Sequence, residues 1–547
     1  MHVYRRSLRL HDHAAVAACA STGKKVYPVY VLDPDCYELL RCSVNRANFL
    51  LESLRDLDAQ LRARYASRLL VVKGKPAEVL PPLWKQWGVD TMTLDADQTT
   101  EPYAMQRDAA VRAAAKKANV DVLEFPTETL RDLVSYESKS GPNGVPETYT
   151  GFTNLWKSFG KAPVDPESPT PTLPAIDKAL LDNTAYDVPK DATGIPWPTT
   201  LKRSDGLTPI WTKSDVRANP KCKHHPGGET AGLARLEKMV TQRKEWVKQF
   251  EKPKTSPNSL THSTTALSMY VGLGCVSPRR FYHEVAKIYA SGPHAQPPVS
   301  LHGQLFWREF NYCMARKANR NVAGSWGQME GNYLCRSIPW RRPADDAVAA
   351  EHYAAWREGR TGYPFVDACM RQLRQEGYIH HLARHMVACF LTRGDLWISW
   401  EDGARVFEEE LLDADYAVNN FNWLWLSCSG FFYQYFRCYS PIAFGKKTDP
   451  NGDFIRKYVP ELKAYDKKYI YEPWKAPLPD QKKWGCMIGN GKDYPKPIVA
   501  HDEASKANMS LVAAAYAEHK AGKEDADKKR KQETAPPGAG AKKASRK

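Results

Sequence analysis

Apolar, β-branched runs alternate with helix-like segments through the first 125 residues, and this alternation constrains the fold more than any other feature of the sequence. We expect buried strands at 26–32, 68–72, 91–94 and 120–125. We expect the intervening helices at 43–65, 76–87 and 101–118. Strands that alternate with helices form a parallel sheet covered on both faces, so the prediction is a doubly wound, Rossmann-like α/β domain. Because no GxGxxG motif follows the first strand, a standard dinucleotide site is not supported there.

The pattern changes after this domain. Residues 127–225 are rich in proline and polar side chains, which predicts a long connector with little core of its own. From residue 227 to about 474 the apolar residues recur with the helical period. Helices are expected at 229–250, 264–271, 278–290, 301–317, 365–376, 378–392 and 400–412. With no strand pattern of comparable strength, this part is predicted to be one large all-helical domain.

We therefore divide the chain into four parts. An α/β domain is expected at 1–130, a connector at 131–225, a helical catalytic domain at 226–500, and a C-terminal helix with a disordered basic tail at 501–547. From about Ala521 the tail has too few apolar residues to order itself. Its basic clusters, Lys528–Lys531 and Lys542–Lys543, are spaced like a bipartite nuclear import signal, although such clusters also occur in ordinary basic tails.

Charge and cysteine usage narrow the class of protein. There are 78 basic and 62 acidic residues, a net charge of +16, which favours a polyanionic partner over the alternative of a merely basic soluble protein. Twelve scattered cysteines without a CxxC pair indicate reduced thiols in the nucleus or cytosol. Residues 416–436 are uncharged and long enough to span a bilayer, but their asparagines favour a buried helix that lines a polar ligand.

Three segments carry polar groups that suggest chemistry. In 378–392, His381, Arg384 and His385 share one helical face, which is costly unless that face meets a ligand or a carboxylate. A zinc pair is disfavoured because Leu382 stands where HExxH has Glu, and a satisfied histidine pair in the core stays open as the structural alternative.

The other two segments are 413–425, with two carboxylates and three asparagines before an apolar run, and 256–268, with three consecutive hydroxyls at an expected helix start. The segment 413–425 could hydrogen-bond a flat heterocycle; the structural alternative is that Asp413 simply caps a helix. The second suits an anion at a helix N-terminus, or ordinary N-capping.

These segments resemble the cryptochrome/photolyase family. The resemblance also includes 4–12 (YRRSLRLHD), similar to the family's opening strand, and the flavin-domain signatures 300–310 (SLHGQLFWREF) and 360–368 (RTGYPFVDA). Similarity to the (6-4) photolyase and animal-type cryptochrome branch extends over HHLARH at 380–385, TRGDLW at 392–397, FGKKTDPNG at 444–452 and YIYEPW at 469–474. Two positions depart from the pattern: Tyr378 stands for a usual Trp, and Phe421 for a usual Gly.

The resemblance implies a non-covalent FAD and assigns roles to particular residues. It places Ser263, Thr264, Thr265 and Ser268 on the phosphates, and Gln304, Trp307, Arg308 and His381 along the site. It places Asp413 and Asp415 on the ring and ribose side, pairs Arg384 with Asp413, and sets Asn419 against the reactive flavin nitrogen. Trp423, Trp400 and Trp340 match the electron-transfer triad, and Trp397 is a candidate fourth donor. An antenna pigment, 8-hydroxy-5-deazaflavin or methenyltetrahydrofolate, would bind the α/β domain, and the sequence does not decide between either pigment and none.

The implied reaction is light-driven repair of (6-4) photoproducts in UV-damaged DNA, by an electron from excited reduced FAD. His381 is expected to protonate a lesion flipped into the pocket, and His385 to tune it. The protein would act as a nuclear monomer without a membrane anchor. The alternative is an animal-like cryptochrome, a blue-light photoreceptor or circadian regulator that binds transcription or clock proteins without repair.

Overall fold

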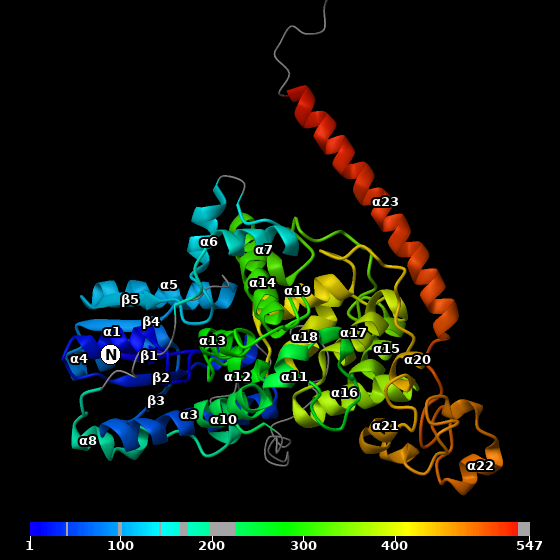
Figure 1. The fold of residues 1–547 in the computed structure, drawn as a ribbon, viewed down its shortest axis with the longest axis horizontal. Helices are drawn as coiled ribbons and strands as arrows, with labels where there is room; N and C mark the ends of the chain where they lie inside the picture. The colour runs from blue at the N-terminus through cyan, green and yellow to red at the C-terminus, as the bar shows by residue number, and fades with distance from the viewer. Residues whose placement is uncertain (40–41, 97–100, 142–143, 165–172, 196–224, 534–547) are drawn as a thin grey trace, which may run out of the picture.

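The computed structural model describes residues 1–39, 42–96, 101–141, 144–164, 173–195 and 225–533 (Figure 1). Its N-terminal part is a five-stranded parallel sheet in the order β3-β2-β1-β4-β5. The strands are β1 (His2–Tyr4), β2 (Pro28–Leu32), β3 (Leu70–Lys73), β4 (Thr91–Asp95) and β5 (Asp121–Phe125). The order reverses at β1, with two later strands on each side. The predicted doubly wound sheet is confirmed.

Helices cover both faces of this sheet. They are α1 (Ala14–Ser21), α2 (Pro34–Leu39), α3 (Val44–Tyr65), α4 (Pro76–Trp87) and α5 (Pro102–Lys117). Successive strand residues point to opposite faces, so Val3 joins one core with α4 and α5, and Tyr4 joins the other with α1 and α3. The second core continues without a break into the helical part of the chain.

The segment 4–12 was expected to be the opening strand, but most of it is not part of a strand. Only Tyr4 of this segment belongs to β1. The residues that follow leave the sheet because they bind the helical part: Arg9 donates to the Gly274 carbonyl at 2.9 Å, and the Leu10 amide donates to Glu229 at 2.8 Å. This segment therefore fastens the two parts of the chain together.

The connector contains short helices in the described stretches between 126 and 225. They are α6 (Leu133–Ser140), α7 (Tyr149–Ser158), α8 (Lys178–Leu181), η2 (Thr184–Tyr186) and η3 (Ala192–Gly194). The fully buried Glu309 anchors the start of the connector, since its carboxylate accepts bonds from the Leu130 and Arg131 amides, each at 3.0 Å. The connector is thus bound to the helical part at this point.

Most of the remaining chain is helical, as predicted. The helices before the site are α10 (Glu229–Met239), η4 (Thr241–Arg243), α11 (Lys244–Gln249), η5 (Lys252–Lys254), α12 (Ser268–Gly272), α13 (Pro278–Tyr289), α14 (Leu301–Asn321), η6 (Ser325–Gly327), α15 (Ala347–Glu358) and α16 (Pro364–Glu376). Those that follow are α17 (His381–Cys389), η7 (Phe390–Gly394), α18 (Trp400–Glu410), α19 (Tyr416–Leu426), α20 (Ala443–Lys446), α21 (Asp453–Tyr458), η8 (Pro460–Leu462), η9 (Pro473–Lys475), α22 (Leu478–Lys483) and α23 (His501–Glu533). Among the described residues no helix combines the length and apolarity that a membrane crossing requires.

Four expected helices have different bounds. The expected helix 229–250 is divided into α10, η4 and α11, and the expected helix 264–271 begins only at Ser268. The expected helix 378–392 begins at His381 because the His380 ring caps it, accepting a hydrogen bond from the Leu382 amide. The uncharged run 416–436 is helical only to Leu426, after which Cys428 adopts a left-handed φ of 60° that ends the helix.

The C-terminal helix is longer than predicted. We expected disorder from about Ala521, but α23 continues to Glu533, since alanine, lysine, glutamate and arginine are strong helix formers. Its first half is attached to the body by the ion pair of His501 with Asp395, at 2.7 Å, and its far end extends away from the molecule (Figure 1). Lys528–Lys531 lies on this helix, whereas Lys542–Lys543 lies outside the described residues.

Candidate active site

One face of α17 gathers three imidazoles and a guanidinium. His380 lies at the N-cap, and His381, Arg384 and His385 follow on the helix. The His380 and His381 ring centroids are 4.2 Å apart, and those of His381 and His385 are 6.1 Å apart. The spacing of one helical turn thus brings the predicted polar face together as a compact cluster.

The predicted pairing of Arg384 with Asp413 is present. Arg384 Nη2 donates to Asp413 Oδ2 at 2.9 Å, and the Ser268 hydroxyl donates to the same oxygen at 2.5 Å. The Asp413 side chain is only 6% exposed. A buried carboxylate is stable only with such partners, so α12, α17 and the segment before α19 are fixed around this charge.

The cluster is electrostatically positive and disfavours protonated histidines. Burial lowers the pKa of His380 and of His385 to about 3, and it lowers the pKa of His381 well below its usual value. The next largest cause for His381 and His385 is the ammonium of Lys252, whose own pKa burial lowers to about 8. A site of neutral imidazoles beside two cations is therefore prepared to receive negative charge.

Several polar atoms of the cluster are buried and not satisfied by the described part of the chain. Nε2 of His380, Nε2 of His381 and Oδ1 of Asp413 are buried, and none has a hydrogen-bond partner among the described residues. Ser268 is exposed although both of its chain neighbours are buried. Buried polar groups in proteins are normally satisfied, so these atoms fit a bound polar ligand.

The hydroxyl-rich segment before α12 forms a loop instead of the expected helix start. Ser263 is used within the loop, donating to the Ser256 carbonyl at 3.0 Å, while the Thr264 hydroxyl lies 3.4 Å from the Tyr378 hydroxyl. The Thr265 carbonyl accepts a 2.7 Å bond from Arg235. Ala266 holds a left-handed φ of 46° although it is not a glycine. Such strain commonly marks a ligand-binding loop.

Asp415 and Arg308 lie at the junction of the two domains. The Asp415 carboxylate caps α19 through the Val418 amide at 3.0 Å and accepts a short bond from the Tyr312 hydroxyl. The Arg6 and Arg308 guanidinium groups lie 3.7 and 3.8 Å from it. The structure therefore gives both residues protein partners that join the sheet domain to the helical domain.

The remaining residues predicted to line the site make contacts within the protein. Gln304 donates back to the start of its own helix, at the Pro298 carbonyl. Trp307 stacks on Tyr149 with 4.0 Å between centroids, and Phe421 packs 5.8 Å from Trp307. The Asn419 side-chain amide donates to the Ala404 carbonyl at 3.0 Å, which fixes its orientation.

The four predicted electron-transfer tryptophans are all buried. Trp423 is 1% exposed and Trp400 is fully buried, on the packed helices α19 and α18. The rings of Trp340 and Trp397 lie 4.6 Å apart, and both are less than 10% exposed. The two outer tryptophans therefore form a contacting pair.

The structure adds residues that the sequence did not point to. Lys252 acts on the histidines from η5, and the Tyr439 hydroxyl contacts His385 Nδ1 at 3.2 Å. Arg235 joins the hydroxyl loop from α10. All three reach the site from distant elements, so no local spacing in the sequence identifies them as site residues. The only available signal was that Lys252 and Tyr439 stand close in the chain to segments that were expected to form the site.

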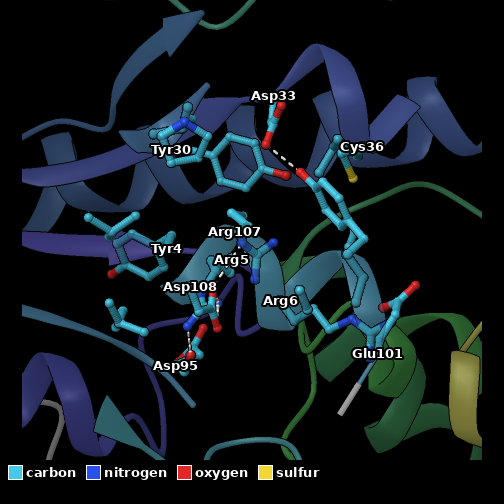
Figure 2. Close-up of a pocket in the computed structure, with 18 of the residues that line it drawn as sticks. Tyr4, Arg5, Arg6, Tyr30, Asp33, Cys36, Asp95, Glu101, Arg107 and Asp108 are labelled. Atoms are coloured by element: carbon cyan, nitrogen blue, oxygen red, sulfur yellow. Dashed lines mark hydrogen bonds and ion pairs between the residues drawn. The ribbon is translucent and has the colours of Figure 1, made fainter. Parts of the chain in front are cut away.

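A separate cavity of about 190 Å³ lies at the carboxyl ends of the strands (Figure 2). It opens where β1 and β4 lie side by side, the point at which the strand order reverses, which is where open α/β sheets bind ligands. Arg5, Arg107 and Asp108 line one side, with Arg5 and Arg107 both paired to Asp108, and Tyr30 lies opposite. Leu412 and Ala414 of the helical domain complete the wall.

Comparison with known proteins covers nearly the whole chain. The family described as "FAD binding domain of DNA photolyase" matches residues 300–514, and the family described as "DNA photolyase" matches residues 2–174. Mouse (Mus musculus) cryptochrome-1 is 44% identical over 519 residues, which cover 94% of this chain and 80% of the mouse protein.

Two solved structures extend the comparison to the fold. The bacterial class III photolyase of Agrobacterium tumefaciens superposes with a TM-score of 0.72 at 28% identity, covering 94% of this chain and 97% of that one. The cryptochrome of Synechocystis has a TM-score of 0.72 at 26% identity, with 93% and 98% covered.

Proposed function

The chain belongs to the cryptochrome/photolyase family and is a FAD-binding flavoprotein, and from this premise we propose that it repairs (6-4) pyrimidine–pyrimidone photoproducts in DNA under blue light. The observation that carries the proposal is the face of α17. There, neutral imidazoles, two cations and buried polar atoms without a partner among the described residues lie together. A light-driven electron carrier alone does not need a group of imidazoles in its site, whereas a repair site that protonates its substrate does.

FAD supplies, in its reduced and photoexcited form, the electron that begins the reaction. Thr264, Ser268 and the cations Lys252 and Arg384 would hold its negatively charged groups. Asp413 positions Arg384 through their 2.9 Å contact. We also propose that Asn419 and Asp415 lie on the ring side of the flavin, as the resemblance implies.

His381 would donate a proton to the lesion, and His385 would tune how readily His381 gives up that proton. Nε2 of His381 has no hydrogen-bond partner among the described residues, so it is free to bind a ligand atom. Negative charge brought by phosphates would raise the pKa of His381 from its lowered value, because it opposes the repulsion from Lys252. Tyr439 holds the ring of His385 through its hydroxyl.

The proposed substrate is double-stranded DNA with a flipped-out lesion. Extruding a damaged pair costs little, because its stacking is already disturbed. The net charge of +16 would neutralise phosphates around the site, so affinity should fall as salt rises.

Repair is tested with purified, photoreduced protein and an oligonucleotide that carries one (6-4) photoproduct. Blue light should restore the original pyrimidines, and a dark control should not. His381→Ala should abolish restoration while FAD remains bound. Absence of restoration by the intact, reducible protein would refute the proposal, and loss of FAD from the variant would assign His381 a structural role.

The 44% identity with mouse cryptochrome-1 favours a second candidate: a blue-light photoreceptor or circadian transcriptional regulator that binds transcription or clock proteins. A transcriptional reporter that responds to this chain, with or without light, would support it, and an unchanged reporter would count against it. We place either activity in the nucleus because of the basic clusters near the C-terminus. A fluorescent fusion that loses nuclear accumulation after Lys528–Lys531 is changed to alanine would support that placement; unchanged accumulation would refute it.

We place an antenna pigment, a deazaflavin or a folate, in the cavity at the strand ends. Ala414 lines this cavity, so Ala414→Trp would fill it. We expect the variant to lose the pigment's absorption while direct excitation of FAD still works. A pigment that stays bound would exclude this cavity.

A further inference from the structure

Arg6 lines the cavity at the strand ends and also contacts the helical domain (Figure 2). Its Nη1 atom lies 3.5 Å from Glu128 Oε2 and 3.7 Å from Asp415 Oδ2. Glu128 also lines the cavity, whereas Asp415 is the N-cap residue of α19. One guanidinium therefore contacts both the cavity wall and the start of the helix that carries Asn419 and Trp423.

Arg6 is held more loosely than Arg5 and Arg107 on the same wall. Those two arginines share the Asp108 carboxylate, which Arg107 contacts at 2.9 Å. Charge-assisted hydrogen bonds from nitrogen to a carboxylate are usually about 2.7–2.9 Å long, and both Arg6 distances are longer. The Arg6 side chain is also 27% exposed. It can therefore turn toward a ligand in the cavity without breaking a short hydrogen bond.

Asp415 is the group through which Arg6 can act on α19. Asp415 Oδ1 accepts the Val418 amide at 3.0 Å, and the Asp415 carbonyl accepts the Asn419 amide at 2.8 Å. The Arg6 and Arg308 guanidinium groups both lie within 4 Å of Asp415 Oδ2, and this side chain is 4% exposed. Buried charges are screened less than exposed ones. Movement of Arg6 away from Asp415 would therefore leave more uncompensated negative charge at the first turn of α19.

We propose that Arg6 couples the cavity at the strand ends to the flavin site. An anionic group bound in the cavity, a carboxylate or a phosphate, draws the Arg6 guanidinium away from Asp415. FAD is then held less tightly, because it carries two phosphate charges and the site has become more negative. The coupling is reciprocal, so FAD weakens the binding of the anion by the same factor. This inference rests on the proposed place of Asp415 beside the flavin.

The variant Arg6→Gln tests the flavin side of the coupling without any ligand in the cavity. It removes the cation from Asp415, and FAD affinity in a fluorescence titration should fall about fivefold, the lower end of common coupling factors. Arg6→Lys keeps the charge and should restore most of the affinity. Unchanged FAD affinity in Arg6→Gln would refute the proposal, and an equal loss in Arg6→Lys would refute its electrostatic basis.

Arg279→Gln is the matched control for simple loosening of the two domains. Arg279 of α13 contacts Asp12 at 2.8 Å, so this pair also joins the N-terminal segment to the helical part. Loss of the pair should lower the melting temperature but leave FAD affinity unchanged. If Arg279→Gln weakens FAD binding as much as Arg6→Gln does, Arg6 acts only by holding the domains together, and the proposal is overturned.

The ligand side is tested on the wild-type chain, which also decides the question if Arg6→Gln does not fold. Methenyltetrahydrofolate carries two carboxylates and is the probe. When its absorption shows that it is bound, FAD affinity should be about fivefold lower than without it. Arg6→Gln should lose this dependence on the folate. Equal FAD affinity with and without bound folate would refute the coupling.

These outcomes are separable from failure of the other proposals. FAD titrations need no damaged DNA, so a chain that repairs no lesion still gives both results. A folate that does not bind would overturn the step in which a carboxylate ligand draws Arg6 away. The comparison of Arg6→Gln with Arg279→Gln would still decide whether Arg6 supports FAD binding through Asp415.

Discussion

Gly403 of α18 lies against the ring of Trp423, and its replacement by alanine should disturb the electron-transfer pathway. A Cβ at this position would lie 2.2 Å from Cη2 and 2.4 Å from Cζ3 of Trp423, and 2.6 Å from Cδ2 of Leu391. Ordinary carbon contacts are about 3.5–4.0 Å. The indole would therefore have to move by more than about 1 Å, although it is only 1% exposed.

The magnitude follows from two opposing effects. Overpacking a core costs about 1–3 kcal/mol, and the higher helix propensity of alanine returns about 1 kcal/mol. The matched control is Gly522→Ala in α23, where a Cβ meets nothing within 4 Å and only the propensity gain applies. The variants should differ by about 2 kcal/mol, which corresponds to several degrees in melting temperature for domains of this size.

Two assays check this prediction. Thermal unfolding by circular dichroism measures stability, and the rate of FAD photoreduction under blue light measures electron supply. We expect Gly403→Ala to melt below wild type and to photoreduce more slowly, with Gly522→Ala unchanged in photoreduction. Equal melting temperatures for the two variants, or wild-type photoreduction in Gly403→Ala, would refute the reasoning.

Three further predictions address charge in the active site. Arg384→Met removes the cation from the buried Asp413, and FAD affinity should fall about tenfold or more in a fluorescence titration, because a charge-assisted bond is worth about 1.5–3 kcal/mol; unchanged affinity would exclude the ion pair from cofactor binding. His385 has a pKa near 6.5 when unfolded and about 3 when folded, so only the unfolded state binds its proton in between and stability falls as pH drops from 6.5 toward 3. His385→Gln should reduce that slope by about 1 kcal/mol per pH unit in denaturant titrations at pH 5 and pH 6, and an equal slope would contradict the assignment. Lys252→Met removes the strongest charge that opposes protonation of His381, so the pH profile of repair should shift upward, and an unshifted profile would show that Lys252 does not act on the reaction.

Periodicity predicted the parallel α/β sheet and the helical domain, but not the central strand β1, whose three residues are too few to show a period. The sheet-domain helices α3, α4 and α5 all begin within one residue of the expected positions, and Ser43 and Pro76 are local start signals for the first two. Helix ends inside the helical domain were harder to predict. The end of α19 depends on the left-handed backbone at Cys428, and nothing in the local composition marks it.

The site was predictable where one helix carries it. His381, Arg384 and His385 follow from a single period, and the resemblance implied the contact of Arg384 with Asp413 that the structure shows. Lys252 and Tyr439 were not predictable, since their proximity to His385 depends on how η5 and the loop after α19 pack on α17. These contacts join segments more than 50 residues apart, beyond the reach of spacing arguments.

The segment 412–415 links the two candidate sites in space. Leu412 and Ala414 line the cavity at the strand ends, while Asp413 between them pairs with Arg384 in the active site. Gly272 reinforces this wall from the end of α12: it lines the same cavity, and a Cβ on it would lie 3.6 Å from Asp413 Cα. Leu412, Asp413 and Ala414 thus lie between the cavity in which we propose a pigment and the ion pair that we propose positions FAD. A substitution that moves the backbone of 412–414 should therefore change both the cavity and the contact of Arg384 with Asp413.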